Sequence, residues 1–190
     1  MKIAARRTQV GIVFTLLGLI GGAAYYLLFQ ANPPSGSHNA NPSQGQSVVS
    51  LVPKEHQVSV YWIEATEKKF RAVPQTVKAI DNEQALEQAI QQLFTAPPSG
   101  LYSGIPPATK LLNFSANDRD VFINVSKEFK EGGGSASMLA RVTQVVYTAS
   151  SLNPTANVFI LVEGEPIGTV GGEGLEIKQP MTRQDLPLEF

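Results

Sequence analysis

Residues 121–150 read "VFINVSKEFKEGGGSASMLARVTQVVYTAS", and the hydrophobic period changes within this stretch. Over 121–125 apolar and polar residues alternate, which predicts a strand with one buried face. After the glycines, apolar residues recur three or four positions apart, which predicts a helix over 135–152. Ser135 is a candidate N-cap, and the Asn-Pro pair at 153 and 154 ends the helix. A strand, a glycine-rich turn and a helix therefore form the centre of the predicted fold.

Upstream of this centre, the pattern predicts a β-hairpin over 111–125, in which the "NDRD" turn separates two apolar runs. The stretch "DNEQALEQAIQQLF" (81–94) has one apolar helical face. Asp81 and Gln84 resemble a capping box at its start, and two prolines end it. Proline and glycine punctuate residues 97–110, which we expect to form a loop.

A first hairpin is predicted before this helix. Residues 57–63 alternate, with Trp62 on the side expected to be buried. Residues 69–77 form a second short strand that we expect Pro74 to interrupt. The basic run at 68–71 is expected to be a solvated strand edge.

Downstream of the central helix, "NVFILV" (157–162) predicts a strand and "EGEP" (163–166) a turn. The glycine-rich residues beyond the turn begin extended, and the tail reads as irregular. The element order is therefore ββ–α–ββ–α–β, which indicates an α+β domain. We expect a mixed sheet with two helices on one face, an αββαβ core and an N-terminal hairpin.

The chain divides by composition. Residues 10–29 carry no charge, and twenty helical residues span about 30 Å, the thickness of a bilayer core. Basic residues precede this run, so we expect a transmembrane anchor with residues 1–9 cytoplasmic and the rest outside. A cleaved signal peptide is the alternative, although the run is long for one and ends in bulky residues. Residues 30–53 read as a disordered linker, and 54–190 as one domain.

The charge of this domain argues against a nucleic-acid partner. All 16 acidic residues and 12 of the 15 basic residues fall within 54–190, so its formal charge is 12 − 16 = −4. Nucleic-acid surfaces need clustered lysine and arginine instead. The absence of cysteine excludes a lipidated cysteine and a disulfide framework.

The glycine loop raises the possibility of a nucleotide site, which its residues do not support. A P-loop needs lysine and then serine or threonine after the last glycine, but Ser135 and Ala136 follow Gly134. A dinucleotide fingerprint needs a third glycine where Ser137 stands. The second glycine cluster (168–174) also fails this pattern. We therefore expect no nucleotide and no other cofactor, and interpret the glycines as turn residues.

Other chemistry finds little support. His38 lies in the linker and His56 just before the first strand, where we expect it to be solvated; neither has partners at metal-ligand spacing. Glu163 and Glu165, with Glu173 and Glu176 nearby, are candidate paired carboxylates for glycan hydrolysis, although Glu163–Pro166 also reads as an exposed turn. Tyr61 is a candidate for stacking on sugar rings. We expect no catalytic residue and no metal site.

Four separated blocks resemble the GerMN domain of sporulation and spore germination. They are "ALEQAIQQLFTAPPSGLYSGIPPATKLLNFSAND", "VFINVSKEFKEGGGSASMLARVTQVVYTAS", "VFILVEGEPIGTVGGEGLEI" and "PMTRQDL", and together they cover about 58–186. The resemblance implies an αββαβ ring-building motif, anchorage in the cell envelope and a role in assembly or interaction, with no enzymatic activity. Here there is one copy, and Ala96 stands where the family commonly has glycine.

Two functions follow as hypotheses. The first is a membrane-anchored, extracytoplasmic interaction or assembly module of the bacterial envelope, which binds copies of itself or other envelope proteins. The second is a peptidoglycan-binding or cell-wall hydrolase-associated domain. In the first, exposed backbone beside a helix N-terminus would accept an acidic group from a neighbouring subunit. The candidate interaction residues are Gly132, Gly133, Gly134, Ser135, Glu163, Glu165, Gly171 and Gly172.

Overall fold

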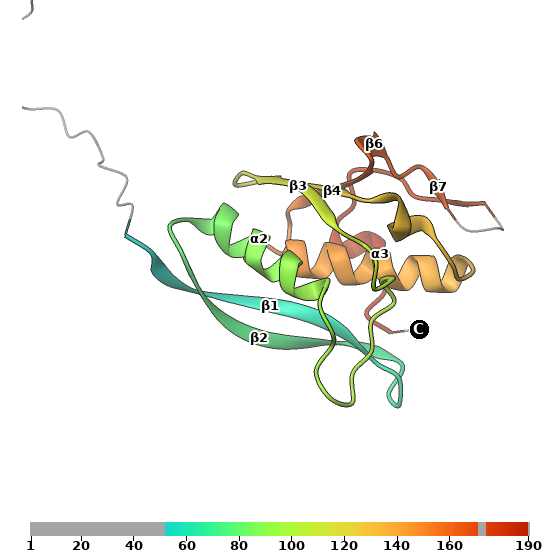
Figure 1. The fold of residues 1–190 in the computed structure, drawn as a ribbon, viewed down its shortest axis with the longest axis horizontal. Coiled ribbons are helices and arrows are strands. Elements are labelled where there is room, and N and C mark those ends of the chain that lie inside the picture. Colours follow the sequence, from blue (N-terminus) through green and yellow to red (C-terminus); the bar gives the residue numbers. More distant parts are fainter. Residues whose placement is uncertain (1–51, 171–173, 190) are drawn as a thin grey trace, which may run out of the picture. The chain divides into compact units, whose positions relative to one another are not determined.

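The computed structural model describes residues 52–170 and 174–189, which belong to one compact unit. This unit has a four-stranded sheet, two helices beneath it and a two-stranded hairpin on the other side of the helices (Figure 1). The elements are β1 (Lys54–Glu64), β2 (Lys69–Ala79), α2 (Asn82–Leu93), β3 (Leu111–Ala116), β4 (Asp120–Val125), the 3-10 helix η1 (Lys127–Lys130), α3 (Ser135–Ala149), β5 (Asn157–Val162), β6 (Glu165–Pro166), β7 (Thr169–Val170), β8 (Leu175–Glu176) and the 3-10 helix η2 (Arg183–Asp185).

The four-stranded sheet has the strand order β3–β4–β5–β6. β3 and β4 are antiparallel, β4 and β5 are parallel, and β5 is antiparallel to β6. Parallel neighbours need a crossover connection, and α3 provides it. Alternate residues are fully buried, among them Val121 and Ile123 of β4 and Val158 and Ile160 of β5. The predicted mixed α+β fold and the order α2–β3–β4–α3–β5 are thus confirmed.

The hairpin of β1 and β2 is a separate sheet. Its inward face buries Val58, Val60 and Trp62, the last as predicted. The two helices are therefore covered on both sides, and ten of the 15 residues of α3 are buried. The sequence pattern predicted only one covered face for each helix.

Pro74 does not interrupt β2, contrary to our expectation. Tyr61 of β1 directs its own N–H and C=O to α3, although Ala72 lies opposite it in β2. Alternation along an antiparallel pair then turns the N–H positions of Ala72 and Pro74 toward the outer edge of β2, away from β1. Proline fits at such a position because no ladder hydrogen bond is lost.

The start of α2 is capped as predicted. The Oδ1 atom of Asp81 accepts a hydrogen bond from the Gln84 N–H at 2.8 Å. The reciprocal bond differs from a capping box, because Gln84 Oε1 accepts from the N–H of Ile80 at 2.9 Å. The apolar face behind this cap is buried: Ala85, Leu86, Ala89, Ile90 and Leu93.

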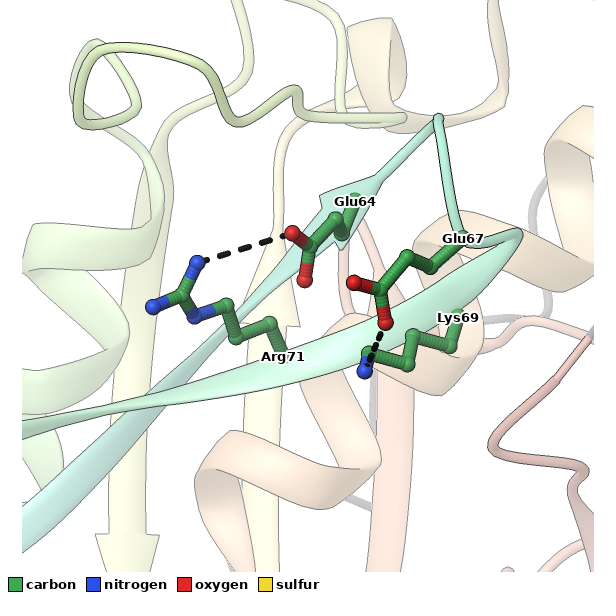
Figure 2. Close-up of polar contacts among 4 residues, drawn as sticks. All are labelled: Glu64, Glu67, Lys69 and Arg71. Atoms are coloured by element: carbon green, nitrogen blue, oxygen red, sulfur yellow. Dashed lines mark ion pairs between the residues drawn. The ribbon is translucent and has the colours of Figure 1, made fainter.

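The tip of the hairpin carries two ion pairs on its surface (Figure 2). Arg71 lies 3.6 Å from Glu64, and Lys69 pairs with Glu67. The hydrogen bond from Lys69 lowers the pKa of Glu67, and the same contact raises the pKa of Lys69. Such exposed pairs contribute little to stability. The basic run is solvated as expected, except that Phe70 within it is buried.

Several sequence predictions need correction or lie outside the described residues. The turn at 163–166 is shorter than expected, since β6 begins at Glu165, and the residues beyond it form the small pair β7–β8. The apolar segment 10–29 and the linker 30–53, apart from its last two residues, fall outside the described ranges. Within those ranges, none of the helices has the length and apolar character needed to cross a membrane.

Candidate functional site

A buried arginine binds the backbone of the glycine loop (residues 132–134) and of the residues before it. Arg141 of α3 is 2% exposed, and its Nη1 atom donates to the carbonyl oxygens of Phe129 (2.6 Å) and Glu131 (3.0 Å). Its Nη2 atom donates to the carbonyl oxygen of Gly132 (3.0 Å) and to Ser137 Oγ (3.2 Å). All these acceptors are neutral, and burial lowers the pKa of Arg141. Arg141 thus fixes the loop that leads from η1 into α3.

This support explains why the loop needs glycine. Gly132 and Gly133 have φ angles of 65° and 79°, which glycine adopts without steric cost. A Cβ atom on Gly133 would lie 2.5 Å from Ser137 Oγ. The expected N-cap role of Ser135 is wrong: Gly134 occupies the N-cap position, and Ser135 Oγ has no hydrogen-bond partner in the structure. The first turn of α3 lacks a side-chain cap.

The second candidate loop, at residues 163–166, also makes hydrogen bonds within the domain. Glu163 has a φ of 53° in the turn after β5, and its Oε1 atom accepts from the Lys127 N–H at 2.9 Å. The Gly164 N–H donates to Asn124 Oδ1 at 2.9 Å. Glu165 is exposed in β6. Gly171 and Gly172, like Glu173, lie outside the described residues.

The environments of His56 and Tyr61 differ from those that we expected. His56 lies within β1 and is 7% exposed, so it is not a solvated residue; its Nε2 atom has no hydrogen-bond partner in the structure. Tyr61 is only partly exposed: its ring lies 5.2 Å from that of Tyr147, and the Arg183 guanidinium lies over both rings. Tyr61 therefore does not present a free ring to a sugar.

The sequence reasoning missed a polar face on α3. The fully buried Gln144 donates from Nε2 to the Tyr61 carbonyl (3.0 Å) and accepts at Oε1 from the Gly104 N–H (2.7 Å). Thr148 Oγ1 accepts from the Tyr61 N–H at 3.0 Å. Gln144 and Thr148 are four residues apart and so lie on one helical face. Two polar residues at this spacing within an apolar helix could have predicted a buried polar face, although the spacing does not identify the backbone groups that they bind.

The C-terminal segment closes one edge of the four-stranded sheet. Gln179 donates from Nε2 to the Ile160 carbonyl (2.9 Å) and accepts at Oε1 from the Ile160 N–H (2.8 Å), so its amide replaces a neighbouring strand. The backbones of Met181 and Val158 exchange two hydrogen bonds. Arg183 anchors the segment by donating to the carbonyl oxygens of Tyr147 and Ser150 at the end of α3. Figure 1 shows this C-terminal segment beside α3 and the sheet.

The opposite edge, along β3, has no such cover. At the β3–β4 turn the Asn117 N–H bonds the Asp120 carbonyl, so alternation turns the N–H and C=O groups of Phe114 and Ala116 away from β4. The Ala116 N–H is taken by Glu83 Oε1 at 3.1 Å. Apart from that bond, no hydrogen bond from outside the sheet reaches the backbone of Phe114 or Ala116 in the part of the chain that the structure describes.

Two hollows lie along this β3 edge, between α2 and β3. The first, of about 310 Å³, is lined by Glu87, Gln91, Phe94, Thr109, Lys110, Leu111, Leu112 and Asn113. The second, of about 510 Å³, is lined by Asp81, Asn82, Glu83, Leu86, Ala116, Asn117, Asp118, Leu152 and Asn153. We call the two together the β3 groove. Among residues 52–170 and 174–189, no group of three histidine, cysteine or carboxylate residues is placed to hold a metal ion.

The fold and the contacts described above define a mixed α+β domain with αββαβ order, in which the buried side chains of Arg141, Gln144 and Thr148 bind the domain's own backbone. The sequence model of the Germane family, described as sporulation and spore germination, matches residues 59–168. The chain belongs to the Germane family. This confirms the resemblance drawn from the four sequence blocks. A comparison with curated protein sequences found no significant match.

Solved structures of similar fold support the assignment of the fold. The first GerMN domain of the sporulation protein GerM from Bacillus subtilis has a TM-score of 0.54 at 20% identity and aligns with 68% of this chain and 99% of its own. The tandem GerMN domains of GerM have a TM-score of 0.53 at 21% identity, covering 70% of this chain and 48% of theirs. A candidate lipoprotein from Clostridium perfringens has a TM-score of 0.50 at 24% identity, covering 78% and 99%.

Proposed function

We propose that this protein is a membrane-anchored, extracytoplasmic interaction or assembly module of the bacterial cell envelope and does not catalyse a reaction. The observation that carries the proposal is the contrast between the two edges of the main sheet. An exposed strand edge is a template for pairing with another chain. The buried polar residues that would otherwise suggest catalysis, such as Arg141 and Gln144, are occupied by the domain's own backbone.

The membrane part of this proposal rests on the sequence and on one relative. Residues 10–29 are apolar and uncharged, with basic residues before them. The Clostridium perfringens neighbour is described as a candidate lipoprotein, which is consistent with a domain held at a membrane surface. A reporter fused after Phe190 should work only outside the cytoplasm. Activity of a reporter that works only in the cytoplasm would overturn this topology.

Crosslinking of the full-length chain in native membranes tests the interaction role. We expect a small set of crosslinked species that identify the same envelope proteins, or a second copy, in repeated experiments. Recovery of the uncrosslinked chain alone, over a range of linker lengths, would count against an interaction module.

Binding to peptidoglycan is the second candidate, and one observation favours it at a new position. Tyr102 is 59% exposed beside a hollow of about 400 Å³ whose lining carries no charged side chain. The Tyr102 backbone exchanges two hydrogen bonds of 2.9 Å with Ile63, which fixes the backbone that carries this exposed ring. An exposed aromatic ring beside an uncharged hollow can stack on a sugar. Co-sedimentation of the full-length chain with peptidoglycan that Tyr102→Ala abolishes and Tyr61→Ala leaves intact would support this function; absence of co-sedimentation would remove it.

A further inference from the structure

The β3 groove has a shape and a charge that together indicate its occupant. β3 supplies outward N–H and C=O groups at Phe114 and Ala116 in a sheet whose other edge is closed. α2 forms the facing wall. An extended chain lying between β3 and α2 would pair with the edge strand through its main chain and direct alternate side chains into the two hollows.

The charges that line the groove are mostly of one sign. Four carboxylates line the two hollows, from Asp81, Glu83, Glu87 and Asp118, against one ammonium group, from Lys110. Two of these side chains are partly engaged, since Asp81 caps α2 and Glu83 accepts from Ala116. A strand entering this groove meets a negative potential, which favours a cationic partner and disfavours an acidic one.

The same charges argue against a second copy of this domain as the occupant. If two β3 strands paired edge to edge, two acidic grooves would face each other, and like charges at an interface cost several kcal/mol. The domain as a whole is also negative, with 12 basic and 16 acidic residues in 54–190. Repulsion between copies therefore adds to the local effect.

Two local features indicate that the groove is prepared for a partner. Thr109, which lines the first hollow, is 5% exposed, and its Oγ1 atom has no hydrogen-bond partner in the structure. A register shift between Leu111 and Asn113 leaves Leu112 at 47% exposure beside the same hollow. A buried hydroxyl without a partner is costly, and an exposed leucine beside a groove is available for contact.

We propose that the β3 groove binds an extended, lysine- or arginine-bearing segment of another envelope protein, which adds to β3 as a fifth strand of the main sheet. The Glu83 carboxylate occupies the Ala116 N–H in the free domain and gives it up to the incoming main chain. This inference rests on the interaction role proposed above and names its surface and the chemistry of its partner.

The test uses the full-length chain in neutral detergent micelles and a fluorescein-labelled peptide in which lysine and valine alternate, with both termini blocked. We expect fluorescence anisotropy to report binding that weakens as salt rises, because the attraction is screened. The same peptide with glutamate in place of lysine should not bind. Absence of lysine–valine binding at low salt would overturn the proposal.

Two variants localise the binding. Combined Glu83→Gln, Glu87→Gln and Asp118→Asn should weaken the peptide at least about tenfold, whereas the matched control Glu163→Gln with Glu165→Gln should leave affinity unchanged. Ala116→Pro removes an outward N–H, and with it the bond to Glu83, without touching the β3–β4 ladder. It should therefore abolish binding and lower the thermal midpoint only slightly. Equal loss in the control, or full binding by the triple variant, would overturn the assignment.

Other outcomes separate this inference from the proposed function. If the full-length chain dimerises, Ala116→Pro abolishes the dimer and the peptide does not compete, the occupant is a second copy and our assignment is wrong. If crosslinked partners in membranes are unchanged by Ala116→Pro and the peptide does not bind, the interaction role stands and the β3 groove is not its site. Absence of any crosslinked partner would count against the role itself.

Discussion

The two edges of the main sheet differ in how their backbone groups are satisfied. Along β5, Ile160 is bonded through both N–H and C=O by the Gln179 side chain, Val158 pairs with Met181, and β6 covers the end of the strand. Along β3, one carboxylate reaches one N–H, at Ala116. Both edges belong to the same sheet, so the difference comes from what the rest of the chain places beside them.

This contrast indicates how a small domain can combine a fixed core with one surface for pairing. An unprotected edge is a risk for aggregation, and proteins usually shorten, bend or cover it. Here β5 is covered by a segment almost twenty residues away along the chain, whereas β3, with six residues like β4 and β5, has only a register shift at its start. We expect the largest effects from variants that remove the cover of β5, and smaller effects from variants of the glycine loop and of the start of η2.

Arg183→Ala should have the largest effect. Arg183 donates to Ser150 Oγ (2.8 Å) and to two carbonyl oxygens at the end of α3, and its guanidinium lies 4.9 Å from the Tyr147 ring centroid. Loss of these charge-assisted bonds and of the contact with the ring should lower the free energy of unfolding by about 3 kcal/mol. Urea denaturation measures this. Arg183→Lys keeps the charge without the planar fork and should recover only part of the loss.

The same variant should also open the β5 edge. Because Arg183 anchors the segment that carries Gln179, hydrogen exchange at the Ile160 and Val158 amides should accelerate in Arg183→Ala. Unchanged exchange at these amides would show that the β5 edge is protected independently of this anchor.

Gln179→Ala tests the closure directly and should lower the free energy of unfolding by about 2–3 kcal/mol. It leaves the Ile160 N–H without a partner, and the Ile160 carbonyl keeps only the bond from the Ile167 N–H (3.1 Å). Gln179→Glu is the matched control. Its carboxylate still accepts from the Ile160 N–H but cannot donate to the carbonyl, so its stability should fall between those of the other two. Urea denaturation that ranks alanine equal to glutamine would contradict this account.

Gly133→Ala should cost about 1–3 kcal/mol, since it places a Cβ at positive φ and against Ser137. Gly134→Ala is the control: beyond its chain neighbours, no atom lies within 4 Å of the position that its Cβ would take, and its φ is −92°. It should change stability by less than about 1 kcal/mol. Thermal unfolding of both variants measures this difference. If the glycines serve the conformation of the loop, only Gly133→Ala should lower the midpoint of unfolding.

Asp185 should give the smallest effect, visible as a dependence on pH. Hydrogen bonds from the Thr182 hydroxyl and N–H hold the pKa of Asp185 below its usual value of 3.8. A lowered folded-state pKa contributes stability above the unfolded-state value, and this contribution is lost as pH falls through the folded-state value. The free energy of unfolding of Asp185→Asn should therefore fall less between about pH 5 and pH 2 than that of the unmodified chain. Parallel pH profiles would contradict this.

Much of the fold followed from local pattern. The apolar spacing of α2 and α3, the alternation in β4 and β5 and the Asp81 cap are properties of neighbouring residues. The structure has them where expected, except that α3 ends at Ala149 and not at 152. Pro74 was misjudged because its effect depends on which way its missing N–H points within a sheet. Ser135 was misjudged because the glycine before it occupies the N-cap position.

The sequence by itself therefore determined the element order, the α+β class and the family, since periodicity and motif blocks are carried by residues close together in the chain. Tertiary structure alone decided the roles of Arg141, Gln144 and Gln179, whose backbone partners lie up to 83 residues away. It also decided that one sheet edge is closed and the other open. A polar side chain in an apolar stretch leads us to expect a partner, because burial without one is costly, but only the folded chain shows which backbone group it is.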